Sequence, residues 1–232
     1  MIAKAVTRAI GQMPDARFRG VLLRGIGITL ALLIAANLAV IWGLGWLIGD
    51  SLTLPWIGTV RWLDDVISWA AIPVMLVLSA FMMIPVASAI TSMFLEDVAQ
   101  AVEDRYHPSL GPAAPISFSE GLRDSLGFLG TMIVANMLAL VLYLLFAPLA
   151  PVIFWALNGF LLGREYFTLA ALRRVGPAEA KRLRRRHIVT IWAVGVIMAV
   201  PLTIPLVNLL VPVLGAAAFT HVFHDLHRRG SA

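Results

Sequence analysis

Four long stretches without a charged side chain constrain this chain more than any other feature. They cover residues 25–49, 66–95, 125–163 and 188–223. About 20 consecutive apolar residues are enough for an α-helix to cross a bilayer. Hydrophobic residues make up 60% of the sequence and charged ones 13%, against about 45–50% and about 25% in soluble domains. The sequence therefore predicts an all-α integral membrane protein.

Proline divides the two longer stretches. The third contains Phe-Ala-Pro-Leu-Ala-Pro at 146–151, and the fourth contains Pro201, Pro205 and Pro212. Proline removes a backbone donor and clashes with the preceding turn, so a helix breaks there. We therefore expect two long transmembrane helices followed by two proline-broken helical hairpins. The hairpin tips are uncharged and can stop inside the bilayer, so that each hairpin penetrates it only in part.

These elements belong to one membrane domain over residues 1–232. The second helix continues past its apolar stretch, because Val98, Ala101 and Val102 keep helical spacing among acidic residues. The expected parts are a basic N-terminal segment (1–24), a first transmembrane helix (25–49), an outer segment (50–65), a long second helix (66–105), a first hairpin (125–174) and a second hairpin (188–226).

Basic residues fall on one side of this topology. If both hairpins return to the side they left, every lysine and arginine except Arg61 lies on the same face, including the run Arg-Leu-Arg-Arg-Arg at 182–186. Cytoplasmic loops carry an excess of such residues. We therefore expect a multi-pass membrane protein with both termini in the cytoplasm.

The third stretch ends in a charged pair, Arg164 and Glu165. One interpretation is a snorkelling arginine that marks the membrane boundary. The other places Arg164 at the mouth of an anion pathway, since charged groups near membrane depth are often functional. Asn158 precedes Glu165 by two helical turns, so both fall on one helix face. We assign Arg164 and Asn158 to substrate binding, and Glu165 to a structural role in which it holds a nearby cation.

The remaining polar features have simpler interpretations. Asn37, Asn136 and Asn208 either line a path or join helices, and joining is the commoner role. The basic segment 181–186 favours contact with anionic lipid headgroups, although it can also concentrate anions; we expect no nucleic-acid partner. Histidines 221, 224 and 227 recur at a spacing of three, which we interpret as interfacial rather than metal-binding. We expect no metal, no cofactor and no enzymatic activity, because Gly-x-Ser-x-Gly, Walker and His-Glu-x-x-His motifs are missing.

Three stretches carry a resemblance to a known family. They are Phe-Leu-Glu-Asp-Val-Ala-Gln-Ala-Val-Glu-Asp-Arg-Tyr-His-Pro at 94–108, Asn-Gly-Phe-Leu-Leu-Gly-Arg-Glu-Tyr-Phe-Thr-Leu-Ala-Ala-Leu-Arg-Arg at 158–174, and Ala-Ala-Ala-Phe-Thr-His-Val-Phe-His-Asp-Leu at 216–226. In their order and surroundings they resemble the CysZ sulfate permeases and etoposide-induced-protein homologues. The resemblance implies two long bent helices, two partly inserted hairpins, homo-oligomers, and sulfate uptake for cysteine biosynthesis.

One position departs from the sulfate permeases. Their first helix begins near a Gly-Leu-Arg associated with sulfate binding, whereas this chain has Gly25, Ile26 and Gly27, with Arg24 before the first glycine. A backbone nest at Gly25 and Gly27 near a helix N-terminus can still hold an anion. Arg24, Gly25 and Gly27 are therefore further candidates for substrate binding.

Two functions remain open at this point. The first is transport of a small inorganic anion, with sulfate as the leading substrate. The alternative is a non-transporting membrane scaffold that organises lipids or partners through its basic surface. A transporter needs polar residues that converge on a path, whereas a scaffold can have a sealed apolar interior.

Overall fold

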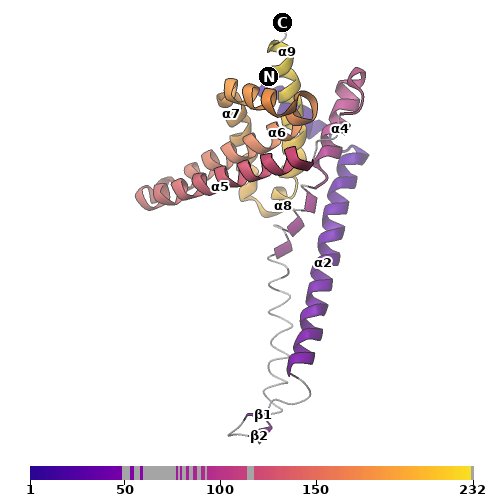
Figure 1. Cartoon of the computed structure of the whole chain (residues 1–232), viewed down its shortest axis with the longest axis vertical. Helices are drawn as coiled ribbons and strands as arrows, with labels where there is room; N and C mark the ends of the chain where they lie inside the picture. Colours follow the sequence, from indigo (N-terminus) through magenta and orange to yellow (C-terminus); the bar gives the residue numbers. More distant parts are fainter. Residues whose placement is uncertain are drawn as a thin grey trace. The chain divides into compact units, whose positions relative to one another are not determined.

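A computed structural model gives the fold of the chain (Figure 1). It describes residues 1–48, 53–54, 58–59, 77, 79, 82–83, 86–87, 90–91, 93–113 and 118–230. Three helical segments within these ranges are long and apolar enough to cross a membrane, namely Ala16–Ala39, Arg123–Leu145 and Ala147–Arg186. The chain is an all-α membrane protein, as its apolar stretches predict.

Two compact units make up the chain. The first contains Met1–Leu22 and Thr91–Ala232, and the second contains Leu23–Ile90. The first unit contains α1 (Ile2–Gly11), the beginning of α2 (Ala16–Ile48), α4 (Leu95–Tyr106), η1 (Pro108–Leu110), α5 (Phe118–Leu145), η2 (Ala147–Leu149), α6 (Ala150–Arg186), α7 (Ile188–Ala199), η3 (Val200–Thr203), α8 (Pro205–Asn208) and α9 (Val211–Gly230).

Helix α9 lies at the centre of the first unit. It contacts α6, α4, α1 and α7, and the two chain ends lie close together because α1 packs on α9 (Figure 1). Small residues at 216–218 and the larger Phe219, Val222 and Phe223 of α9 are fully buried in this core. A helix that buries most of its circumference is stabilised mainly by tertiary packing rather than by its own propensity.

Both proline-containing tips break the helices where the sequence predicts. Helices α5 and α6 are joined by η2, which contains Pro148, and the two helices contact each other as a hairpin. In the second hairpin, η3 and α8 separate α7 from α9, with Pro201 and Pro205 in the first turns of η3 and α8. The first turn of a helix tolerates proline because its N–H would have no intrahelical partner there.

Helix α6 bends once more before its basic end. Gly176 has φ 74° and ψ 173°, and Pro177 follows it inside the segment. A positive φ strains any residue with a Cβ, and proline is favoured at the start of the helix that resumes. The bend therefore separates the long apolar part of α6 from its arginine-rich last turns.

The second membrane helix is not continuous over its expected range of 66–105. Residues 93–94 form a turn, Phe94 has φ −107° and ψ 12°, and α4 begins at Leu95. After this turn, Leu95, Val98 and Val102 of α4 enter a protein core on one face. Helical spacing alone does not reveal such a break.

The second unit is described only in part. Its strands β1 (Thr53–Leu54) and β2 (Gly58–Thr59) pair antiparallel, with Thr53 opposite Thr59. The rest of the expected outer segment at 50–65, and most of 66–92, lie outside the described residues. Asn37 of α2 donates to the Ser79 hydroxyl at 2.6 Å and to its own helix at Leu33. This pattern favours the helix-joining interpretation for Asn37.

Glycine brings α6 and α7 into backbone contact in the first unit. A Cβ added at Gly195 would lie 1.9 Å from the Gly159 carbonyl oxygen, and one at Gly163 would lie 2.9 Å from the Ile191 carbonyl oxygen. Small residues allow membrane helices to approach this closely, which replaces the hydrophobic driving force that lipid lacks. The Trp192 indole also donates across this contact to the Ala156 carbonyl at 2.9 Å.

We expect Gly195→Ala to separate α6 from α7. Overpacking typically costs about 1–3 kcal/mol, and here the obstacle is backbone rather than a movable side chain. Thermal unfolding of the detergent-purified protein measures the loss. The matched control is Gly130→Ala in α5, where no atom lies within 4 Å of the added Cβ and alanine improves helix propensity by about 0.5–1 kcal/mol. Equal melting temperatures for the two variants would contradict the close contact.

Candidate functional site

A buried carboxylate is the centre of the polar contacts in the first unit. Helix α4 buries Leu95, Val98 and Val102, and this orientation carries Glu103 into the core with only 1% of its surface exposed. An ionised carboxylate in such a place is costly unless cations and hydrogen-bond donors surround it. Its partners therefore determine whether α4 can pack there at all.

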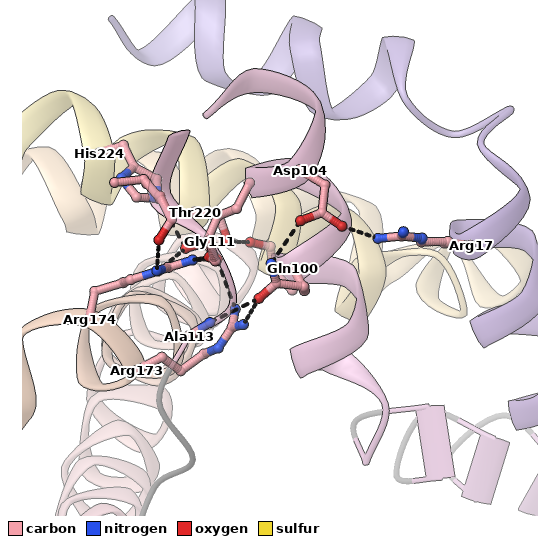
Figure 2. A network of polar contacts seen from close by, with 12 residues as sticks. Arg17, Gln100, Asp104, Gly111, Ala113, Arg173, Arg174, Thr220 and His224 are labelled. Atoms are coloured by element: carbon pink, nitrogen blue, oxygen red, sulfur yellow. Dashed lines mark hydrogen bonds and ion pairs between the residues drawn. The ribbon is translucent and has the colours of Figure 1, made fainter. Parts of the chain in front are cut away.

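Two helices supply those partners (Figure 2). Arg174 of α6 forms a fork with Glu103, its Nε at 3.0 Å from Oε1 and its Nη2 at 2.5 Å from Oε2. Arg173 adds a second cation at 3.6 Å, and His224 of α9 lies with Nε2 at 3.1 Å from Oε1. Two-pronged contacts between arginine and a carboxylate are among the strongest hydrogen-bonded pairs in proteins.

The network extends to both sides of Glu103. Arg173 donates to Gln100 at 2.7 Å, Gln100 donates to Asp104 at 2.8 Å, and Asp104 accepts from Arg17 at 2.5 Å. On the other side, Arg174 donates to the carbonyls of Leu110 at 3.3 Å and Gly111 at 2.9 Å. One connected set of polar contacts therefore ties α4 to the start of α2, to α6, to α9 and to the segment after α4.

The charge state of Glu103 follows from these contacts. Burial by itself would raise the pKa of Glu103, but hydrogen bonds from His224 and Arg174 and the charge of Arg173 outweigh it and lower the pKa to about 2. The carboxylate is therefore ionised and only accepts, so His224 Nε2 must carry a proton in this contact. The network contributes stability above pH 4.5 that is lost as the pH falls toward 2.

A second histidine of α9 is buried without a charge. His221 is 2% exposed and meets the edge of Tyr106 at 4.7 Å between ring centroids. Burial lowers the pKa of His221 to about 4, and the charges of Arg8 and His107 act in the same direction. Residues three apart on α9 lie on the same face of the helix, and α4 covers that face. The expectation that these histidines are interfacial is therefore wrong for His221.

Three arginines line a pocket elsewhere in the first unit. We call it the basic pocket: it has a volume of about 220 Å³ between α5, α6 and α7, and its lining residues are Thr131, Phe160, Arg164, Arg184, Arg185, Ile188, Ile191 and Trp192. Arg184 Nη1 donates to the Thr168 hydroxyl at 2.6 Å, and that hydroxyl donates to the Arg164 carbonyl at 2.6 Å. Thr168 therefore orients Arg184 toward the α6 turn that carries Arg164.

Arg164 also lines a second pocket. This acidic pocket, about 210 Å³ in volume, is lined by Glu96, Asp124, Ser125, Phe128, Arg164, Glu165, Thr168, Leu169 and Leu172. The guanidinium of Arg164 lies over the Phe128 ring at 5.3 Å from its centroid. Its Nη1 is buried, and within the described part of the chain it makes no hydrogen bond. Arg164 is thus a cation with an unused donor between two pockets.

The residues predicted around the first glycines do not form the expected nest. Helix α2 begins at Ala16, so Gly25 and Gly27 lie in its interior, where each amide donates to a carbonyl one turn earlier. Neither glycine has a positive φ. The nest was predicted because the helix was expected to begin at residue 25. Arg24 is exposed on α2.

The other predicted residues lie on α6. Asn158 is half-buried and donates to the Phe154 carbonyl of its own helix at 2.8 Å, so its amide nitrogen is engaged locally. Glu165 lines the acidic pocket beside Arg164, and among the described residues it forms no ion pair within 4.0 Å. The cation expected next to Glu165 is therefore not found among these residues.

The ion network was not predicted from the sequence, although the stretches that contain its residues were singled out. Glu103, Arg173, Arg174 and His224 all fall inside the three stretches that carry the family resemblance. Glu103 also follows Ala99 by one turn, and Ala99 is fully buried, so the apolar face of α4 could have indicated its burial. Arg184 and Arg185 were predicted only as part of a lipid-facing basic segment.

The fold and these contacts define a helical integral membrane protein with a buried ion network and an arginine pocket. A family model described as "Sulfate transporter CysZ/Etoposide-induced protein 2.4" matches residues 5–212. The match covers most of the chain, and the chain belongs to this family. A search of curated proteins found no significant match.

We expect Glu103→Ala to destabilise the protein strongly. The change leaves Arg173 and Arg174 buried without their carboxylate, and removing one partner of a buried pair costs about 3–5 kcal/mol. The control is Arg17→Ala, which breaks an ion pair whose side chains are 57% and 46% exposed and which contributes about 0–1 kcal/mol. Chemical unfolding in detergent measures both. Equal losses would show that burial does not distinguish the two pairs.

We expect the free energy of unfolding to fall on acidification, because His221 is protonated more readily in the unfolded chain than in the folded protein. Between pH 6.5 and 4 the unfolded chain binds a proton at His221 that the folded chain excludes, so the free energy of unfolding decreases with falling pH. The loss from pH 7 to pH 5 is about 2 kcal/mol. His221→Phe should flatten this dependence of stability on pH. A smaller dependence should remain in the variant, because the pKa of His107 is also lowered, mainly by burial. An unchanged slope in the variant would assign the effect elsewhere.

Proposed function

We propose that this protein transports a small inorganic anion across the membrane, with sulfate as the leading substrate and cysteine biosynthesis as the pathway served. The family description supports sulfate. The observation that carries the proposal is Arg164, a cation whose buried Nη1 makes no hydrogen bond within the described residues. A buried donor without an acceptor costs about 1–3 kcal/mol, and an oxyanion removes that cost.

Arg164 also lacks a close ion-pair partner in the described part of the chain. It forms no ion pair within 4.0 Å inside the described ranges, in contrast to Arg173 and Arg174, which share Glu103. Its guanidinium lies over the face of the Phe128 ring. A guanidinium in this situation favours a planar, two-pronged contact with an oxyanion such as sulfate.

The two pockets around Arg164 have opposite character. Arg184 and Arg185 on the basic side raise the local concentration of anions, whereas Asp124 and Glu165 on the acidic side weaken anion binding. Conduction requires binding that is favourable enough for entry and weak enough for release. Arg164 lines both pockets, so an anion held there would be favoured by the arginines of one and disfavoured by the carboxylates of the other.

The distribution of basic residues supports one orientation of the protein in the membrane. We place the protein in the bacterial inner membrane with both termini in the cytoplasm, because the basic segments at 1–24 and 164–187 then share one side. We expect homo-oligomers. Of the other predicted residues, Arg24 stays a candidate because it is a cation on a membrane helix, and Asn158 is a weaker one because its amide nitrogen is engaged by its own helix.

Uptake of radiolabelled sulfate into proteoliposomes tests the proposal. We expect uptake above that of empty liposomes, and a loss of about tenfold or more in Arg164→Gln, since a charge-assisted hydrogen bond contributes about 1.5–3 kcal/mol. The control is Arg182→Gln, because Arg182 is 72% exposed and pairs with Glu179 on its own helix. Arg24→Ala is assayed in parallel and tests the residue before Gly25.

The outcomes separate the two functions. Uptake that disappears in Arg164→Gln but not in Arg182→Gln supports transport past Arg164. Uptake that is lost only in Arg24→Ala places the path along α2 instead. Folded protein without uptake of sulfate or of competing anions contradicts transport, and the non-transporting scaffold becomes the better description.

A further inference from the structure

The basic pocket has two chemically different halves. Arg164, Arg184 and Arg185 form one half, and the apolar side chains of Phe160, Ile188, Ile191 and Trp192 form the other. We propose that it binds an anionic membrane lipid, with the phosphate on the arginines and the start of an acyl chain against Ile188 and Trp192. This goes beyond transport, and beyond the diffuse attraction of lipids expected of segment 181–186.

The charged half of the pocket carries an excess of positive charge. Arg184 interacts electrostatically with Arg164 and Arg185, both of the same sign, and with Asp124 as the opposing charge. Its Nη1 is held by Thr168, which fixes the direction of the guanidinium. With the buried Nη1 of Arg164 also lacking a hydrogen bond in the described ranges, the pocket presents oriented donors that suit the oxygens of a phosphate.

The apolar half is open toward the outside of the protein. Ile188 is 48% and Trp192 42% exposed, whereas Ile191 behind them is buried. The Trp192 indole donates to the Ala156 carbonyl, so one end of the ring is satisfied and its face remains available. Tryptophan in this arrangement is typical of the boundary between acyl chains and headgroups.

The size of the pocket argues against a bare inorganic anion as its full occupant. A volume of about 220 Å³ exceeds the space that the five heavy atoms of a sulfate or phosphate need. The surplus lies along the apolar side chains. A ligand that fills both halves carries a phosphate and an apolar group on the same molecule.

The position of the pocket in the chain agrees with a lipid. It forms where the arginine-rich end of α6 meets the uncharged beginning of α7, at His187. Such a change from basic to apolar residues marks the level of the headgroups. An anionic lipid can therefore reach Arg184 from the membrane without leaving it.

The lipid proposal does not rest on transport. Both assign a role to Arg164, so the tests use Arg184 and Trp192 and measure binding without a gradient. A lipid that fails to bind leaves sulfate uptake to be judged by its own assay, and a protein that takes up no sulfate can still bind the lipid.

Calorimetric titration of the full-length protein in detergent tests the site. The probes are dioctanoyl phosphatidic acid, dioctanoyl phosphatidylcholine with the same chains, and inorganic phosphate. We expect the phosphatidic acid to bind more tightly than the other two, and Arg184→Gln to weaken it about tenfold or more. Trp192→Ala should weaken it as well, and Arg182→Gln should not.

Three results would overturn the proposal. Inorganic phosphate binding as tightly as phosphatidic acid would make this a site for a free anion. Phosphatidylcholine binding equally would reduce it to an apolar surface. An equal loss in Arg182→Gln and Arg184→Gln would reduce it to diffuse charge. If Arg184→Gln fails to fold by its melting curve, the exposed Arg185 provides the replacement variant Arg185→Gln, which must weaken phosphatidic acid binding for the proposal to stand.

Discussion

The burial of Glu103 is the constraint on which the first unit depends. A carboxylate with 1% of its surface exposed must be compensated by cations, and no residue of α4 itself compensates it. Arg173 and Arg174 come from α6 and His224 from α9, so the position of α4 in the fold depends on both helices. A buried ion pair adds little net stability over an apolar core, but an incomplete one costs several kcal/mol. We therefore expect the network to act on specificity, by disfavouring arrangements in which these helices are shifted.

Close packing of α6 and α7 produces the basic pocket by a different physical route. Gly159, Gly163 and Gly195 let the two backbones touch, which brings Trp192 of α7 beside Ala156 and returns the basic end of α6 to the level of Arg164. The bend at Gly176 and Pro177 is required for that return. Arg164 and Arg184 are thus neighbours because of glycines that carry no charge, and a larger side chain at the contact would separate them without altering either arginine.

Hydropathy and proline were sufficient to predict an all-α membrane fold and the broken tips between α5 and α6 and between α7 and α9, because lipid imposes the same requirement along the whole length of a helix. They were insufficient for the turn at Phe94 and for the start of α2 at Ala16, which moved Gly25 and Gly27 into a helix interior. Both depend on tertiary packing, since Phe18 and Val21 of α2 and Leu95 of α4 are buried, and a single sequence does not contain that information. Arg164 was predicted as a site from its place at the end of an apolar stretch, whereas Glu103 was missed because its partners are distant in sequence.

Helix α6 shows the charge imbalance that both proposals start from. Within the described residues, Arg173 and Arg174 both pair with Glu103 at one level of this helix, while Arg164 has no ion-pair partner at the other. Glu165 follows Arg164 directly and lines the same acidic pocket, but it forms no ion pair with Arg164. A cation that is partly removed from water and not paired favours any anion that can reach it. A transported oxyanion and a lipid phosphate meet that requirement with the same chemistry, and they differ in the apolar wall of Ile188 and Trp192, which only the lipid uses.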